Sequence, residues 1–68
     1  MKGKITVNDQ VIDWRDGMTV SDVLTVMNYT FKLLVIQIDG KNVKRDDWPT
    51  ATVPEGADVK VIHLMSGG

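Results

Sequence analysis

The sequence predicts a small α+β domain, in which one main helix packs on one face of a mixed sheet of four to five strands. The chain has 68 residues, which is room for one small domain. Its β-branched residues are abundant, because Val, Ile and Thr far outnumber Ala and Leu, and such residues favour sheet. Short segments with alternating polarity recur between turn residues, whereas only one segment has helical spacing.

The composition argues against several classes of protein. Eight basic and nine acidic residues give a net charge of -1, so no basic surface is predicted to bind nucleic acid. The longest apolar run, residues 33–36, is too short to cross a membrane or to form the core of a signal peptide. We therefore expect a cytoplasmic protein that has no membrane partner.

The start of the chain predicts a hairpin. Residues 4–7 alternate polar and apolar side chains, as a half-buried strand does. Asn8 and Asp9 follow, and both tolerate the left-handed backbone of a tight turn. Residues 10–14 then form the return strand, with Ile12 and Trp14 on one face.

The segment after this hairpin predicts the helix. Thr19 and Asp22 have the spacing of a capping box, although Asp replaces the preferred Glu. One helical face is apolar, and its members are Val20, Val23, Leu24 and Met27. Asn28 accepts the left-handed conformation at a helix C-terminus, so we expect a helix of about three turns that ends near it.

A second hairpin follows the helix. Residues 34–38 form a hydrophobic strand, and the Asp39-Gly40 pair is a strong signal for a tight turn. Residues 41–44 are polar enough to form a short edge strand that discourages unwanted pairing.

The rest of the chain leads to a final strand. Residues 45–52 have no clear period, and Trp48 is expected to close one end of the core. A turn is predicted over residues 53–56, with Pro second and Gly fourth. The last strand then covers residues 58–64.

The order strand, strand, helix, strand, strand, strand predicts a β-grasp, or ubiquitin-like, fold with the helix on one face. We expect a single domain at residues 1–64 and a flexible tail at residues 65–68. On the last strand, Val59 and Val61 are expected to face the helix, whereas Ile62 and Leu64 face the opposite way, near Val35.

The tail is the candidate for chemistry. Gly67 and Gly68 contribute nothing to packing and are costly to order, but they suit a chain end that enters a narrow channel. Residues 65–68, when extended, reach roughly 13 Å. A terminal carboxylate, with an ordinary pKa of about 3.5, is ionised at neutral pH and can attack phosphorus. Two terminal glycines alone are also typical of a frayed end or a vector remnant.

The side chains offer little to a conventional active site. The chain has no Cys, which excludes a disulfide, a thiolate nucleophile and a thiolate zinc site. His63 is the one histidine and is expected to be structural or to face solvent. Trp14 and Trp48 are expected in or against the core, and the Asp46-Asp47 pair at a helix start or in solvent. We therefore expect no catalysis by this chain acting alone.

Several segments together resemble one known family. They are residues 5–8, 19–20, 39–40, 43–45, Trp48, residues 54–59, 61–62 and 67–68. With them the chain is similar, over nearly its whole length, to the thiamine-biosynthesis sulfur-carrier (ThiS) family of the ubiquitin-like, MoaD-like superfamily. Ala57 departs from the family pattern, in which Gly and Asp are adjacent in this turn.

The resemblance implies a specific role for the tail. In the family, a ThiF-like adenylating enzyme uses ATP to activate the terminal glycine carboxylate, and sulfur from a cysteine-derived persulfide then displaces AMP. The thiocarboxylate so formed gives its sulfur to thiazole synthase. This role falls on Gly68, with Gly67 and Ser66 giving access, and the chain itself is expected to bind no cofactor. A free carrier is expected to be a monomer.

A docking surface is also expected for these partners. Val35, Ile62, Leu64 and Met65 form an apolar group beside the tail. The alternative is that they are ordinary surface hydrophobic residues, which are common.

Two other functions remain open. One is sulfur delivery to molybdopterin, a tungsten cofactor or tRNA. Molybdopterin-type carriers tend to be longer and to have aromatic and proline residues before the terminal glycines, where this chain has residues 62–66. The other is a non-catalytic ubiquitin-like interaction module whose terminal glycines are inert.

Overall fold

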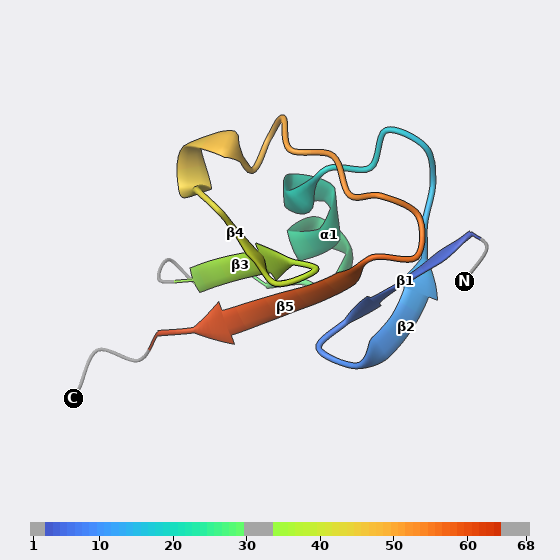
Figure 1. Ribbon diagram of the computed structural model, residues 1–68, viewed down its shortest axis with the longest axis horizontal. Helices are drawn as coiled ribbons and strands as arrows, with labels where there is room; N and C mark the ends of the chain where they lie inside the picture. Colours follow the sequence, from blue (N-terminus) through green and yellow to red (C-terminus); the bar gives the residue numbers. More distant parts are fainter. Residues whose placement is uncertain (1–2, 30–33, 65–68) are drawn as a thin grey trace.

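The fold is a mixed sheet with one α-helix on one of its faces (Figure 1). The computed structural model describes residues 3–29 and 34–64. Its strands are β1 (Lys4–Val7), β2 (Gln10–Asp13), β3 (Leu34–Ile38), β4 (Lys41–Val43) and β5 (Asp58–His63). They lie in the order β2-β1-β5-β3-β4, so the last strand in the sequence occupies the centre. The predicted α+β, β-grasp class is confirmed, and β2, β4 and β5 each end one residue earlier than predicted.

Strand directions follow from the connections between the strands. Two tight turns join β1 to β2 and β3 to β4, and both hairpins are antiparallel. Asn8 and Asp9 have φ values of 51° and 68°, and Asp39 and Gly40 have φ values of 50° and 84°. Two successive left-handed residues give a turn whose twist matches that of the flanking strands. β5 joins the hairpins, running parallel to β1 and antiparallel to β3.

The helix α1 (Val20–Val26) begins at the predicted capping box. The Asp22 N–H donates to the Thr19 hydroxyl at 3.2 Å, and the Thr19 N–H donates to the Asp22 carboxylate at 3.0 Å. The helix has 7 residues, about two turns rather than the predicted three. Thr19 and Met27, which were expected within the helix, instead cap its two ends.

The helix ends close to Asn28, as predicted: Met27 is its C-terminal cap, and Asn28 follows in the left-handed conformation with a φ of 58°. The Asn28 N–H donates to the Thr25 carbonyl at 3.1 Å, and the Tyr29 N–H donates to the Leu24 carbonyl at 2.9 Å. These two bonds form a Schellman motif, which reverses the chain direction. Tyr29 is thereby directed back toward the sheet.

The core lies between α1 and the inner face of the sheet. Its fully buried members come from α1 and from β1, β3 and β5, and they are Ile5, Val7, Val20, Val23, Ile36 and Val59. Half-buried Ile38 and Val61 pack against this cluster. The predicted facing of the strands is therefore confirmed, since Val59 and Val61 of β5 both pack on the helix side.

The connection between β4 and β5 passes over the N-terminal end of α1 (Figure 1). The two tryptophans hold it in place. The Trp48 indole N–H donates to the Val43 carbonyl at 3.1 Å, and the Trp14 indole N–H donates to the Val53 carbonyl at 2.7 Å. Trp48 is buried in the core and Trp14 packs against it, as predicted.

The turn before β5 lies one residue later than predicted. The Ala57 N–H donates to the Pro54 carbonyl at 3.2 Å, so the turn covers residues 54–57. Gly56 has a φ of 78°, which suits the third position of a type II turn. Ala57 is buried, and its carbonyl accepts the Thr6 N–H at 3.0 Å. The residue that departs from the family pattern thus takes part in the pairing with β1.

Candidate functional site

The candidate site lies at the C-terminal end of β5, the central strand. Figure 1 shows this strand ending beside the start of β3 at one side of the molecule, with β1 and β2 on the opposite side. Leu64 is the last described residue. Four predicted site residues, Met65, Ser66, Gly67 and Gly68, lie outside the described residues.

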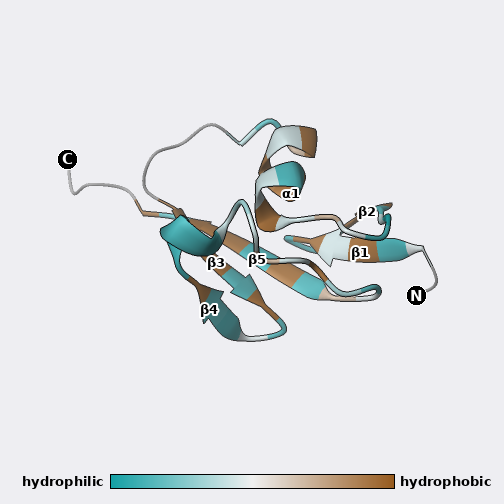
Figure 2. Cartoon of the chain, turned by 90° about the horizontal axis from the view of Figure 1, so that it is seen from above, coloured by the Kyte–Doolittle hydropathy of each residue, from teal (hydrophilic) through white to brown (hydrophobic). Residues whose placement is uncertain are grey.

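The other three predicted docking residues are brought together on the open face of the sheet. Val35 on β3 is directly opposite Ile62 on β5. Ile62 is 44% exposed and Leu64 is 49% exposed, so both present apolar surface where β5 ends. The alternation of apolar and polar residues along β5 is visible in Figure 2, where β5 runs between β1 and β3. We name Val35, Ile62 and Leu64 the open-face patch.

Lys60 separates this patch from the charged part of the same face. Its ammonium group lies 3.0 Å from the Asp9 carboxylate and 3.8 Å from the Asp58 carboxylate. The hydrogen bond with Asp9 raises the pKa of Lys60 above its ordinary value. On the next strands, Lys4 bonds to Asp13 and lowers the pKa of that carboxyl. The open face is therefore apolar near the end of β5 and carries paired charges farther away.

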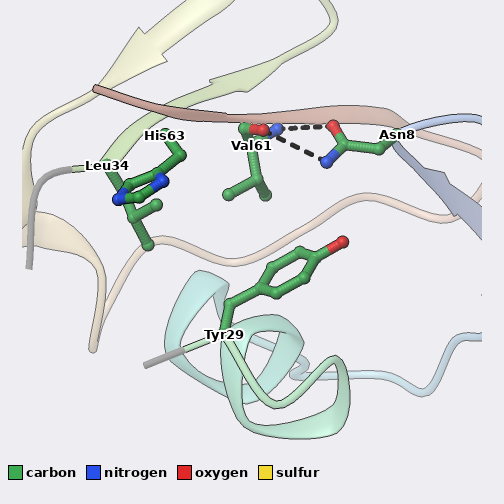
Figure 3. A pocket seen from close by; sticks show the side chains of 5 residues that line it. All are labelled: Asn8, Tyr29, Leu34, Val61 and His63. Carbon is green, nitrogen blue, oxygen red and sulfur yellow. Dashed lines mark hydrogen bonds between the residues drawn. The ribbon is translucent and has the colours of Figure 1, made fainter. Parts of the chain in front are cut away.

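The helix-side face of the same strand end contains a small cavity (Figure 3). Its volume is about 130 Å³, and it is lined by Asn8, Tyr29, Leu34, Val61 and His63. Tyr29 points from the end of α1 toward the strand, and His63 lies beside Leu34. His63 is exposed, which agrees with its predicted place at the surface.

Asn8 has a role at this site that was not predicted, because the sequence indicated only that it forms a turn. Asn8 has its side-chain amide directed at β5, where it makes two hydrogen bonds to the backbone of Val61 (Figure 3). The sequence contains an indirect signal for this contact. The first strand ends at Val7, whereas the last strand is longer. An Asn directly after Val7 therefore lies beside a part of the last strand that has no strand paired with it on that side.

Within residues 3–29 and 34–64, no three His, Cys, Asp or Glu side chains come together to hold a metal ion. In the same ranges, no buried side-chain nitrogen or oxygen lacks a hydrogen bond. None of the helices described there is long and apolar enough to span a membrane. What the arrangement offers is an apolar surface and a firmly held strand next to the chain end.

Comparison with known proteins agrees with this arrangement. The sequence model of the ThiS family matches residues 3–68. Among solved structures, the chain is similar to the thiamine biosynthesis protein (ThiS) from Geobacter metallireducens, with 23% sequence identity and a TM-score of 0.76. The alignment covers 96% of this chain and 99% of that one, which shows a common fold over the full domain. Since the family match also includes both terminal glycines, the chain belongs to the ThiS family of small sulfur-carrier proteins.

Proposed function

We propose that this chain carries sulfur for thiazole formation in thiamine biosynthesis, with the carboxylate of Gly68 as the reactive group. The observation that carries the proposal is the family match over residues 3–68, which includes Gly67 and Gly68. Two features of the chain support it. No cysteine is present to hold sulfur on a side chain, and the last strand leads directly into the glycine-containing segment.

The proposed chemistry takes place on a partner enzyme. A Gly68 carboxylate oxygen attacks the α-phosphorus of ATP, and pyrophosphate leaves with the electrons of the broken P–O bond. The terminal sulfur of a persulfide then attacks the acyl carbon and displaces AMP. A thiol reduces the resulting acyl disulfide, which leaves a thiocarboxylate. Glycine suits this sequence because it has no Cβ to obstruct a narrow active-site channel.

The proposed partners are an adenylating enzyme and thiazole synthase, and the open-face patch with Met65 is the proposed docking surface. Val35, Ile62 and Leu64 adjoin the point where the chain leaves the sheet. A partner that covers the patch would therefore hold the chain just before the reactive residue. Exposed apolar side chains in a contiguous group are typical of such interfaces.

Intact-mass measurement tests the proposal. The chain is incubated with ATP, a ThiS-family adenylating enzyme and a persulfide donor, and we expect a product in which one oxygen is replaced by sulfur. Thiazole synthase should then discharge this product, whereas molybdopterin synthase as the acceptor should leave it unchanged. Discharge only by molybdopterin synthase would redirect the chain to that pathway, and no modification at all would support an inert interaction module.

Deletion of Gly68 provides the matched control. We expect this variant to lose adenylation completely and to keep the wild-type melting temperature, because the described core ends with β5. The measurements are pyrophosphate exchange and thermal unfolding. Wild-type adenylation in the variant would contradict the assignment of the reactive group to Gly68.

A further inference from the structure

The pairing between β1 and β5 stops well before β5 does. β1 pairs with β5 through Thr6 opposite Asp58 and Val7 opposite Val59. The chain then turns away at Asn8, whereas β5 continues to His63. Without a further partner, one side of β5 would be unpaired from this point, directly before the proposed reactive segment.

The side chain of Asn8 continues the pairing where the backbone cannot. The Asn8 backbone N–H donates to the Val59 carbonyl at 2.9 Å, as the next residue of a parallel strand would. Its side-chain oxygen accepts the Val61 N–H at 2.8 Å, and its Nδ2 donates to the Val61 carbonyl at 3.1 Å. The amide thus satisfies both polar backbone groups of Val61 on this side (Figure 3).

This contact requires the local backbone geometry at Asn8. The residue has a φ of 51°, a conformation that Asn adopts more readily than most residues. Asp9, the next residue, also reaches β5, but only through the exposed ion pair with Lys60 at 3.0 Å. An exposed ion pair contributes little, so beyond the backbone bond to Val59 the two side-chain bonds from Asn8 are the stronger contact of this turn with β5.

We propose that Asn8 is a positioning residue, which fixes the direction in which β5 delivers the reactive chain end to the activating enzyme. The inference rests on the proposed sulfur-carrier function. Val61 is held by Asn8 on one side, and on the other side β3 pairs with β5 as far as Leu34 opposite His63. With both sides attached, β5 is held in one direction relative to the neighbouring strands as far as its end at His63. A partner that binds the residues after β5 then finds the end of this strand already ordered, which lowers the entropy cost of binding.

The Asn8→Gly variant tests this role. Glycine adopts the same positive φ without strain, so the variant removes the side-chain amide and keeps the turn. We expect hydrogen exchange at the Val61 N–H to become about 5-fold faster, since that group loses its acceptor. With the activating enzyme, we expect KM for the carrier to rise about 3- to 10-fold while kcat changes less than about twofold, because a less ordered strand end weakens binding and not the chemical step.

Asp9→Gly is the control, because it changes the same turn and leaves both Asn8 bonds in place. We expect wild-type exchange at Val61 and wild-type KM in this variant. Exchange at Ile36, deep in the core, should be unchanged in both variants.

The outcomes separate this inference from the proposed function. Unchanged exchange at Val61 in Asn8→Gly would overturn the attachment itself. Faster exchange with an unchanged KM, or an equal rise in KM in Asp9→Gly, would overturn the positioning role while the carrier function stands. If the unaltered chain is not adenylated at all, the carrier function fails and the positioning role fails with it.

Discussion

Asp22 shows how one carboxylate contributes to the start of the helix. It accepts the Thr19 N–H and donates its own N–H to the Thr19 hydroxyl, which satisfies two groups that the helix leaves unpaired. The hydrogen bond from the Thr19 backbone lowers the pKa of Asp22 below its ordinary value of 3.8, although burial acts in the opposite direction. The shift links helix capping to pH.

This link predicts a pH-dependent stability. Because the pKa of Asp22 is lower in the folded state, its contribution is complete above pH 3.8 and is lost as the pH falls through the folded pKa. In Asp22→Asn the side chain keeps an acceptor but cannot titrate. We expect the wild-type protein to melt at a higher temperature at neutral pH, and the difference to narrow in acid.

Thermal unfolding between about pH 6 and pH 3 measures this difference. Asp16→Asn, in the loop before the helix, controls for the change in net charge. A difference between the wild type and Asp22→Asn that stays constant over this range would contradict the assignment.

At the scale of the element, one face of β5 packs in the core and the other is exposed. Val59 is buried against the helix, whereas Ile62 and Leu64 face outward beside the chain end. An exposed apolar side chain does little for stability, because it stays largely in water after folding. The two kinds of position should therefore respond differently to substitution.

The open-face patch gives the prediction for this element. Leu64→Asp, just beyond the strand, should raise KM for the activating enzyme about 10-fold or more, because a charge would enter an apolar contact. Ile62→Thr, which keeps a β-branched side chain, should raise it by a smaller factor. Both variants should keep the wild-type melting temperature to within a few degrees.

Val11→Thr is the matched control, since Val11 is 52% exposed on the same face but at the far edge strand. We expect its KM to equal that of the wild type. Equal effects at Val11 and Ile62 in steady-state kinetics would show that general surface polarity, and not docking at the patch, is responsible.

The strands could be predicted because alternation and turn residues act locally. Asn8-Asp9 and Asp39-Gly40 need only their own backbone preferences to form turns, and the facing of β5 follows from the period of two. The helix is shorter than predicted because residues that cap it were counted in it. The turn over residues 54–57 is fixed by hydrogen bonds to Lys4 and Thr6, and the Asn8 contact also depends on atoms distant in sequence. The Asn8 side chain meets Val61, a partner 53 residues away that only the difference in length between the first and last strands indicates.

The candidate site could likewise be predicted only in part from local sequence patterns. Val35, Ile62 and Leu64 could be placed on one face from alternation alone, and the structure confirms the pairing of Val35 with Ile62. The roles of Met65, Ser66, Gly67 and Gly68 stay predictions, since they rest on the resemblance to the family. The chemistry proposed for them takes place on a partner enzyme, whose active site is not encoded in this sequence.

At the scale of the whole molecule, one strand joins everything else. β5 pairs with β1 on one side and with β3 on the other, and its Val59 side chain is 1% exposed. A domain of this size has on the order of 5 kcal/mol of stability, so a single core position carries a large share.

Val59→Ala therefore tests the central place of the strand. Removing two buried methyl groups should lower the free energy of unfolding by about 2 kcal/mol. Val11→Ala, at an exposed edge position, should change it by less than about 0.5 kcal/mol. Urea denaturation measures both values, and similar losses in the two variants would contradict the described core.

The central position of the last strand also has a consequence for synthesis. The ribosome makes the two hairpins first, but they cannot join into one sheet until β5, which lies between them in the sheet, has also been made. Nascent or prematurely terminated chains that lack this segment cannot assemble the sheet and remain targets for proteolysis. Every molecule that reaches its folded form has therefore been translated at least through the strand that precedes the proposed reactive group.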